Sequence, residues 1–458
     1  MKTHTFLLLL LLPLTLRAQS YRLPDYEKFT LKNGLTVYLM EQHEVPLISV
    51  AMAFDAGAVY DGPGRAGLAN LTADALLYDT PTRTKAEIEE QLDFLGADLS
   101  TYATKENARL RMAFSAKDRD EVLAILREVV TRPAFNAEEI AKRQDRFVQE
   151  LAQAKESPRR VIGAYFDRFV YGDHPYASPV GGTRGTVADL TRDDVVRFYQ
   201  QHYGPGNAAL TVVGDFDAKE MKRRLGKLFG DWNAQTITTA PVPEPVLSFD
   251  AARVLLVNKG DARETTFLIG GPGVPRRHPD YVAIQVVNTV LGARFTSWLN
   301  DALRVNSGLT YGARSGFDTE RRGGTFTIST FTANATTEQA VDLALHVLDS
   351  LHHHGIDAAT LRSAQNYVKG GYPPEYETSG QLAGLLLDMF TYDFDESFIN
   401  NFQQNVDGLT VTNVRRVIDE HFPKGKLQFV MVGKAEEIRD VAKKYGAVTE
   451  KEITDEGF

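Results

Sequence analysis

The chain contains the same sequence pattern twice, and this repeat restricts its possible folds more than any other feature. Residues 190–214 match residues 409–433 at a constant spacing of 219 positions without a gap, with His202 and His421 in the same register. Each copy reads as a polar cap, a helix, a Gly-containing turn and an apolar strand. A coincidental match of two helix–turn–strand units is the alternative, but a gapless match of this length favours duplication of one domain.

A proline-rich stretch separates the two copies. Residues 235–245 read Gln-Thr-Ile-Thr-Thr-Ala-Pro-Val-Pro-Glu-Pro. Proline at alternate positions favours extended, semi-rigid backbone over helix. A chain of 458 residues is also long enough for two domains. We therefore predict an N-terminal domain at 21–234, a linker at 235–247 and a C-terminal domain at 248–458.

Both halves mix strand and helix signals. Apolar, β-prone runs occur at 36–40, 47–52, 209–213, 254–257, 325–330 and 427–432. Asn33-Gly34 between two such runs predicts a hairpin. Thr84 opens a capping box, and Asn136 can cap a helix that begins near Glu138. The signals do not alternate strictly, so we predict an α+β fold with two homologous domains, each a mainly antiparallel sheet with helices packed on one face.

Charge and composition limit the partners. The formal net charge of −9 argues against nucleic acid or an anionic membrane as the main partner. Residues 1–18 read as a secretory signal peptide, with Lys2, an apolar run at 6–12, Pro13 and the small residue Ala18. No later stretch is long and apolar enough for a membrane helix, and no Cys is present for disulfides or thiolate metal sites. We expect an exported, periplasmic protein.

The segment 67–78, Gly-Leu-Ala-Asn-Leu-Thr-Ala-Asp-Ala-Leu-Leu-Tyr, has the frame of a metal helix without its chemistry. It resembles the metal helix of the insulinase and mitochondrial-processing-peptidase family, the inverted zincins. Their pattern is G-L-A-H-x-x-E-H-x-L, in which two His bind zinc and the Glu is the general base. Asn70, Ala73 and Asp74 occupy these three positions here. The resemblance implies that this chain holds no zinc and lacks a base.

The third zinc ligand of that family is a Glu on a later helix, well beyond the motif. Glu150 lies at the family's distance from the motif and resembles that position. Asp74 and Glu150 together could hold a hard cation through oxygen atoms. The alternative is that Glu150 is an ordinary polar residue that remains after the site was lost.

Three further segments carry the same resemblance. Residues 96–106 resemble the family's G-x-x-x-N-A-x-T-x-x-E strand, which in active members pairs with the peptide substrate as an added strand. Ser100 replaces the usual Asn, which puts this pairing in doubt. His174-Pro175-Tyr176 with Gly181-Gly182-Thr183 resembles the H-P-Y…G-T element, and residues 198–207 resemble F-Y-x-x-x-Y-x-P-x-N. Together the matches span nearly all of the mature chain.

The strongest functional candidate lies in the second half. Residues 303–312 resemble the family's L-R-x-x-x-G-L-x-Y element, in which an Arg and a Tyr seven residues apart reach the zinc site of the other half. Arg304 and Tyr311 have this spacing. A guanidinium and a phenol can both donate hydrogen bonds to the oxygen that becomes negative during peptide hydrolysis. The alternative is a solvated helix-end cation and a half-buried strand residue.

Lost zinc residues and a kept Arg/Tyr pair resemble the non-catalytic subunit of the family's bacterial heterodimers. Our leading hypothesis is a clam-like, non-catalytic subunit of a heterodimeric zinc oligopeptidase that acts on unfolded peptides. A homologous partner with intact H-x-x-E-H would supply the zinc, and Arg304 and Tyr311 would complete its site. The first alternative is a structural or peptide-binding protein without an active partner. The second is an independently active peptidase, which Ala73 disfavours because it cannot act as a base.

Two other segments attract attention. His352-His353-His354 looks like a metal cluster, but consecutive helix residues point in different directions, so we predict a solvated helix end. Tyr372-Pro373-Pro374-Glu375-Tyr376 reads as a loop. The chain contains no phosphate-binding loop and no G-x-S-x-G element, so nucleophilic serine chemistry has no support.

Overall fold

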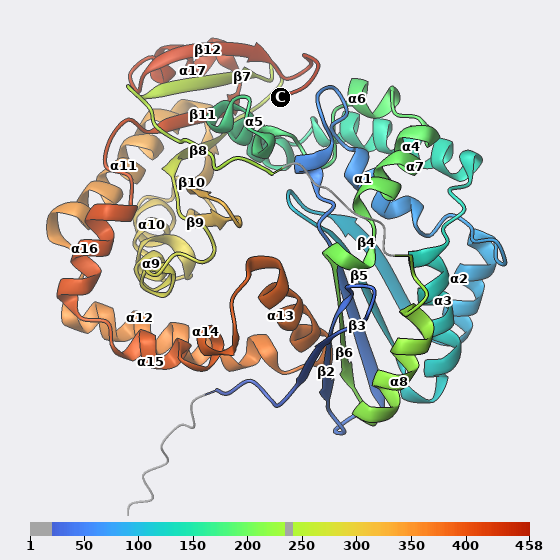
Figure 1. Ribbon diagram of the computed structural model, residues 1–458. Helices are drawn as coiled ribbons and strands as arrows, with labels where there is room; N and C mark the ends of the chain where they lie inside the picture. The colour runs from blue at the N-terminus through green and yellow to red at the C-terminus, as the bar shows by residue number, and fades with distance from the viewer. Residues whose placement is uncertain (1–20, 234–240) are drawn as a thin grey trace, which may run out of the picture.

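The computed structural model describes residues 21–233 and 241–458, which form two halves of like design (Figure 1). The predicted signal peptide at 1–18 and residues 235–240 of the predicted linker lie outside the described residues. The first half contains a six-stranded sheet in the order β1-β2-β6-β3-β5-β4, and the second contains one in the order β12-β7-β11-β8-β10-β9.

Strands at matching places in the two orders have matching directions, apart from the outermost strands β1 and β12. In both sheets only one inner pair is parallel, β2 with β6 and β7 with β11. β1 is antiparallel to β2, whereas β12 is parallel to β7. The strands span Glu27–Thr30 (β1), Thr36–Glu41 (β2), Leu47–Phe54 (β3), Asp98–Ala103 (β4), Ala108–Ser115 (β5), Ala208–Gly214 (β6), Arg253–Asn258 (β7), Glu264–Pro272 (β8), Arg314–Thr319 (β9), Gly324–Ala333 (β10), Gln428–Gly433 (β11) and Ala447–Glu452 (β12).

Helices connect the strands in both halves. Those of the first half are Leu68–Ala75 (α1), Lys85–Phe94 (α2), Arg119–Thr131 (α3), Ala137–Ala154 (α4), Pro158–Tyr171 (α5), Arg184–Ala188 (α6), Arg192–His202 (α7) and Ala218–Phe229 (α8). Those of the second half are Tyr281–Asn288 (α9), Trp298–Asn300 (α10), Thr337–His354 (α11), Ala358–Gly371 (α12), Ser379–Tyr392 (α13), Glu396–Asn400 (α14), Phe402–Asp407 (α15), Val411–His421 (α16) and Ala435–Ala442 (α17).

Several short elements matter for the sites below. Two π-helical segments follow α9 and α10, at Thr289–Ala293 (η5) and Asp301–Asn306 (η6), and a 3₁₀ turn follows α12 at Pro373–Tyr376 (η8). The fold class predicted from the sequence is confirmed, as are the capping box at Thr84 and the cap at Asn136. The predicted hairpin at Asn33-Gly34 joins β1 to β2.

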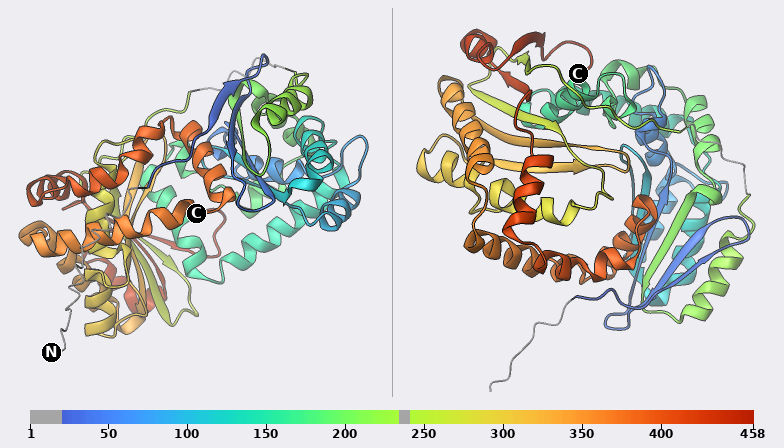
Figure 2. Two further views of the ribbon diagram at one scale, coloured as in Figure 1. Left: turned by 90° about the horizontal axis from the view of Figure 1, so that it is seen from below. Right: turned by 60° about the vertical axis from the view of Figure 1, so that its left-hand side comes forward.

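The two halves exchange one helix each, which the sequence does not predict. Helix α5 leaves the first half and packs on β8 and β11 of the second sheet, where Phe166 lies among Leu255 and Val430. Helix α13 leaves the second half and packs on β3 and β6 of the first sheet. The two halves are therefore joined at both ends (Figures 1 and 2). Each sheet has helices of its own half on one face and a helix of the other half on the opposite face.

Contacts across this joint are specific as well as apolar. Thr211 on β6 donates a hydrogen bond to the carbonyl oxygen of Ala383 on α13 at 3.0 Å. Arg109 on β5 forms an ion pair with Asp388 on α13 at 2.8 Å. On the other sheet, Gly270 is required because a Cβ there would lie 2.5 Å from the ring of Phe166. The exchanged helices thus fix how the two halves are placed relative to each other.

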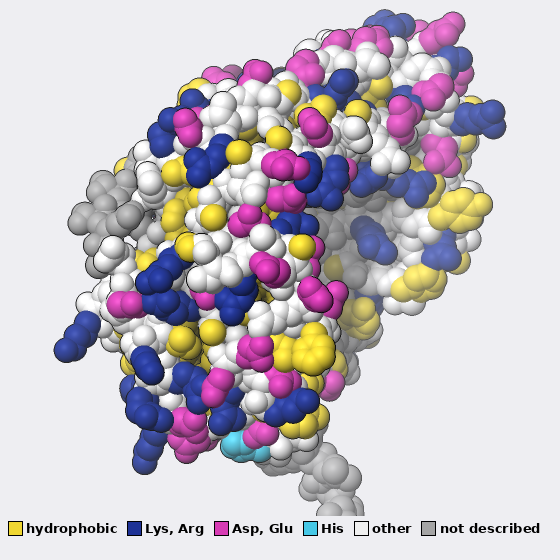
Figure 3. All heavy atoms as spheres, turned by 90° about the vertical axis from the view of Figure 1, so that its right-hand side faces the viewer, with side chains coloured by type: hydrophobic (Ala, Val, Ile, Leu, Met, Phe, Trp, Pro, Cys, Tyr) yellow, Lys and Arg dark blue, Asp and Glu magenta, His cyan; other side chains and the backbone are white. Residues whose placement is uncertain are grey.

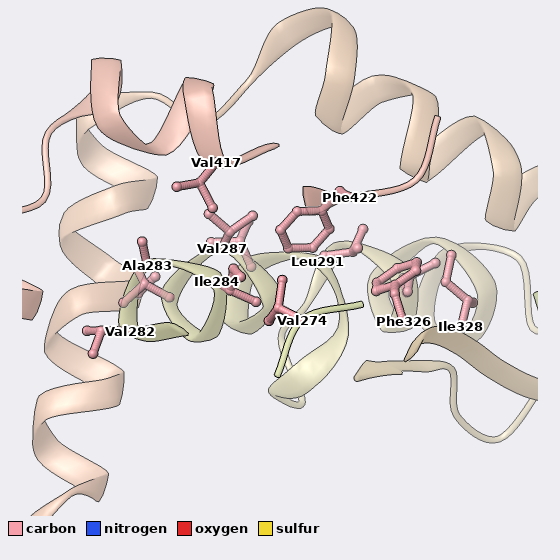
Figure 4. Packing of buried hydrophobic residues seen from close by; sticks show 14 of the residues in the cluster. Val274, Val282, Ala283, Ile284, Val287, Leu291, Phe326, Ile328, Val417 and Phe422 are labelled. Carbon is pink, nitrogen blue, oxygen red and sulfur yellow. The ribbon is translucent and has the colours of Figure 1, made fainter. Parts of the chain in front are cut away.

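The core of the second half lies between its sheet and helices α9 and α16. Figure 4 shows Ile284 and Val287 of α9 facing Val417 and Phe422, beside Phe326 of β10. All five are buried. Burial of aliphatic and aromatic side chains of this size stabilises a fold by roughly 1.5–3 kcal/mol each. This packing fixes α9 relative to α16, which matters for the polar contacts at its start.

The outer face of the first half carries Lys and Arg interspersed with Asp and Glu, and hydrophobic side chains lie scattered among them (Figure 3). Such mixing of signs gives no extended field on this face for a polyanion. Within residues 21–233 and 241–458, no helix is long and apolar enough to cross a bilayer.

Candidate functional site

A buried carboxyl group starts helix α1, which carries the degenerate motif. Asp61 accepts hydrogen bonds from the N–H groups of Gly67 at 2.9 Å and Ala69 at 2.7 Å. These amides belong to the first helical turn, where N–H groups have no partner within the helix. Burial raises the pKa of Asp61 to about 8, against the opposing effect of the two N–H donors. The carboxyl group therefore holds α1 in place.

The three motif positions lie on α1 as the sequence predicts. Asn70 and Asp74 are half-buried and stand one turn apart, so they share a face of the helix. Ala73 is fully buried in the core of the first half. A methyl group at this position can neither ligate a metal nor take a proton from water.

Arg143 of α4 joins the two remaining carboxylates. Its Nε lies 2.6 Å from Oδ2 of Asp74, and its Nη1 lies 3.1 Å from Oε1 of Glu150. The guanidinium also stacks on the ring of Phe147, 3.5 Å from its centroid. Glu150 is thus close to Asp74, as its spacing predicts, but an arginine lies between them. No sequence signal near 70–74 points to Arg143, because it lies on a different helix far along the chain.

These residues do not fit a zinc ion. Asn70 offers an amide in place of an imidazole, and both carboxylates are engaged by a guanidinium that carries a permanent positive charge. Burial raises the pKa of Asp74, and the hydrogen bond and charge of Arg143 oppose this. The hard cation considered for Asp74 and Glu150 is also disfavoured, because Arg143 already binds an oxygen of each carboxylate.

Strand β4 forms one edge of the first sheet. It pairs with β5, and within the described parts of the chain no strand pairs with its outer side. Ser100, which replaces the family's usual Asn, is exposed on this strand. An open edge can accept a peptide as an additional strand. The backbone requirement for such pairing is therefore present, even though the side chain differs.

Arg304 and Tyr311 lie at one loop of the second half. Arg304 is on η6, and the chain then folds back, because the carbonyl oxygen of Leu303 accepts the N–H groups of Leu309 at 2.9 Å and Thr310 at 3.3 Å. Gly308 makes this turn with φ of +66°, a region that favours glycine. Tyr311 follows directly and leads toward β9.

The loop is unusually exposed for its composition. Tyr311 is 83% exposed, and Phe295 and Val305, which neighbour Arg304, are 66% and 63% exposed. Arg304 lies over the ring of Phe295 at 4.7 Å from its centroid, and Tyr311 stacks near Phe331. Exposed apolar side chains that gather around a cation are typical of binding surfaces. The alternative of a half-buried strand tyrosine does not hold for Tyr311.

Sequence reasoning missed a polar cluster at the start of α9. Asp280 accepts hydrogen bonds from both terminal nitrogens of Arg416, at 2.9 and 2.6 Å, and lies 2.8 Å from Nε2 of His421. His278 packs edge-on against His421. The side chains of His278, Asp280 and His421 are close enough to hold a metal, but Arg416 occupies both oxygens of Asp280. No local sequence pattern points to this cluster, because Asp280 and its partners on α16 lie far apart along the chain.

Two sequence expectations in this half are wrong. His352 is 1% exposed, and neither ring nitrogen has a hydrogen-bond partner in the described structure, so the His run is not a fully solvated helix end. It is wrong because the first His faces the core while His353 and His354 point outward. Residues 373–376 form the 3₁₀ turn η8 rather than an irregular loop, and Tyr372 before it is buried.

The fold and the site define a class of protein: a two-domain zinc-peptidase scaffold in which a guanidinium joins the carboxylates at the metal position. Comparison with known sequences identifies the family. Residues 36–184 match the profile of Insulinase (Peptidase family M16), and residues 189–368 match that of the Peptidase M16 inactive domain. The chain belongs to the insulinase family, as an inactive member.

Individual relatives agree with this assignment. An uncharacterised zinc protease of Rickettsia bellii is 27% identical over 66% of this chain and 73% of its own length. Zinc protease PqqE of Helicobacter pylori is 25% identical over 91% and 94%. Among solved structures, a peptidase M16 inactive domain from Pseudomonas fluorescens superposes with a TM-score of 0.84 at 24% identity, covering 90% of this chain and 98% of its own. A protease from Helicobacter pylori gives 0.83 at 23% identity, covering 90% and 100%. At these identities the two structures support the fold.

Proposed function

We propose that this protein is the non-catalytic subunit of a heterodimeric zinc oligopeptidase. The observation that carries the proposal is a contrast between its two candidate sites. The metal position is closed by Arg143 on Asp74 and Glu150. Arg304 and Tyr311, in contrast, flank an exposed turn, and Tyr311 itself is exposed. A chain that has lost its own chemistry but presents such a loop is suited to complete another subunit's site.

The residue types fit that task. A homologous partner with intact H-x-x-E-H supplies zinc and the general base. Arg304 and Tyr311 then donate hydrogen bonds to the substrate carbonyl oxygen as negative charge develops on it, or anchor the peptide chain. Loss of one such donor reduces the rate by about 10²–10³. The exposed side chains of Phe295 and Val305 next to the pair provide apolar area for contact with the partner or the peptide.

The setting follows from the same proposal. The signal-like residues 1–18 direct the chain out of the cytoplasm, and the heterodimer acts on unfolded peptides in the periplasm. Peptides that are small enough to enter the space between the two clam-like subunits are the substrates.

The test is reconstitution with a homologous chain, encoded nearby, that keeps H-x-x-E-H. We expect the two chains to co-purify, and the mixture to cleave a fluorogenic oligopeptide that neither chain cleaves alone. Arg304→Ala reduces kcat/KM of the mixture by about 10²–10³. Arg439→Ala is the matched control. Arg439 lies on α17 of the same half and pairs with Glu450 on β12.

Three results contradict the proposal. One is a tightly held zinc ion in the purified chain, at one per molecule by elemental analysis. Another is peptide cleavage by the chain alone. The third is undiminished cleavage by the Arg304→Ala mixture.

A peptide-binding role without an active partner is the second candidate, and the open edge of β4 favours it. It predicts that peptides bind this chain alone and protect the amides of β4 from hydrogen exchange. The absence of any neighbouring gene for a chain with H-x-x-E-H favours this role over the heterodimer.

A further inference from the structure

The second half contains a cavity at the place where the repeat puts the counterpart of the metal helix. Helix α9 with η5 corresponds to α1, and α12 corresponds to α4. Asp357 caps α12, and Asn136 caps α4. Counted from these caps, the counterpart of Arg143 is Ala364. A cavity of about 560 Å³ lies between α9, α12, η8 and the start of β9. This volume is typical of small-molecule sites.

Aromatic side chains form a large part of the cavity wall. They come from several different elements and include Tyr281, Phe317, Tyr372, Tyr376, Phe394 and Phe398. Two glycines, Gly316 and Gly371, also line it, and a Cβ at either would meet nothing within 4 Å. The cavity therefore has free space on two sides and apolar surfaces that can hold an aromatic or branched side chain.

A cation faces this aromatic wall without a hydrogen-bonded counterpart. Arg276 lines the cavity, and its guanidinium lies 4.1 Å from the ring centroid of Tyr281 and 5.7 Å from that of Phe398. Its Nη1 atom is buried, and among the residues described it has no hydrogen-bond partner. A buried donor without an acceptor is costly, roughly 1–3 kcal/mol, so an anionic group from a ligand would stabilise it.

An acid lies in the same cavity at some distance from this cation. Glu375 on η8 lines it too, and burial raises its pKa while the charge of Arg276 lowers it. No hydrogen bond or salt bridge joins Glu375 to Arg276 in the described structure. The cavity thus presents a hydrogen-bond donor for a carboxylate and an acceptor for an ammonium group. An extended dipeptide, which spans at most about 7 Å, carries both groups.

We propose that this cavity binds a short zwitterionic peptide or amino acid with an aromatic side chain. The ligand carboxylate binds Arg276, its ammonium group binds Glu375, and its side chain packs on the aromatic wall beside Gly316 and Gly371. The proposal rests on the cavity of this chain and needs no partner subunit. Its failure would leave the heterodimer untouched, and the reverse also holds.

The first experiment changes the ligand and uses the mature chain alone. Isothermal titration calorimetry compares the dipeptide Ala-Phe with N-acetyl-Ala-Phe, which lacks the ammonium group, and with Ala-Phe amide, which lacks the carboxylate. We expect Ala-Phe to bind, and each blocked form to bind about 10- to 100-fold more weakly, because each loses a contact with a charged group. Free phenylalanine separates an amino-acid ligand from a peptide ligand.

The second experiment changes the protein. Arg276→Gln weakens binding of Ala-Phe about 10- to 100-fold but leaves binding of Ala-Phe amide unchanged, and Glu375→Gln gives the converse pattern with N-acetyl-Ala-Phe. Gly316→Leu fills the cavity and abolishes binding of all three ligands. Arg277→Gln is the control, because this neighbouring arginine is exposed, pairs with Asp393 and does not line the cavity.

Two outcomes overturn the proposal. One is that wild-type protein binds none of Ala-Phe, its blocked forms and phenylalanine at millimolar concentration. The other is that all three dipeptide forms bind with equal affinity. Should Arg276→Gln fail to fold, which far-ultraviolet circular dichroism detects, the ligand series on the wild-type chain decides the question by itself.

Discussion

Asp61 and Asp280 both lie between a central strand and the first α-helix of their half, β3 and α1 for Asp61 and β8 and α9 for Asp280. Asp61 is 3% exposed and accepts two backbone N–H groups of α1. Asp280 instead binds Arg416 and His421 of α16, and no side chain caps α9. The aspartate before the first α-helix is thus a buried helix cap in the first half and part of an ion pair in the second.

The partners of these two residues diverge in the same way. His202 and Arg197 are the counterparts of His421 and Arg416 at the spacing of the repeat. His202 is buried against aromatic rings, and Arg197 pairs with Asp194 rather than Asp61. Burial lowers the pKa of His202 to about 4. The comparison teaches that two halves of like fold tolerate different polar contacts before their first α-helix, because each half compensates its own polar groups locally.

A large difference between the two halves is expected when each of these two aspartates is replaced by alanine. Asp61→Ala leaves two buried N–H groups without an acceptor, which lowers the free energy of unfolding by about 3 kcal/mol. Asp280→Ala removes contacts with partly exposed side chains and costs about 1 kcal/mol. Urea unfolding at pH 6 measures both. Equal losses would show that the two carboxyl groups play one role, and the comparison would break.

A smaller effect is expected from Arg143, whose counterpart in the second half is Ala364. Arg143→Leu leaves Asp74 and Glu150 without their ion-pair partner and costs about 2 kcal/mol, less than for a fully buried pair because these side chains are 20–57% exposed. In the Arg143→Leu background, Asp74→Leu restores part of the loss, which a double-mutant cycle quantifies. The control Arg439→Leu, at an exposed ion pair, leaves the stability nearly unchanged by the same measurement. If Arg143→Leu were neutral, the guanidinium would not be what stabilises the former metal position.

The sequence predicts the part of this design that is periodic. The repeat, the capping boxes and the apolar runs predict two α+β domains because these features depend on neighbouring residues. The exchange of α5 and α13 could not be predicted, because an amphipathic helix such as α5 shows that it has an apolar face but not which sheet covers it. Arg143 and the cavity around Arg276 depend on contacts between distant segments, so no local pattern indicates them. Arg304 and Tyr311 stay predictions until the two chains are mixed.

The change of stability with pH, about 1.4 kcal/mol per pH unit, distinguishes the two aspartates by sign. The pKa of Asp61 is raised in the folded state to about 8, so its contribution to stability is complete below the unfolded pKa near 4 and is lost as the pH rises to 8. The pKa of Asp280 is lowered, mainly by the hydrogen bond with Arg416, so its contribution is present above pH 4 and is lost in acid.

Each aspartate is therefore compared with its own asparagine variant by urea unfolding at several pH values. The stability of wild type minus that of Asp61→Asn falls by about 1.4 kcal/mol per pH unit between pH 5 and 7. The same difference for Asp280→Asn stays flat in this range and falls only below pH 4. Differences are needed because His202, whose pKa is lowered, gains stability as the pH rises from 4 to 6.5 and masks the fall due to Asp61 in wild type. A flat difference curve for Asp61→Asn would mean that Asp61 is ionised in the folded protein. Both halves would then hold a charged carboxylate before their first α-helix.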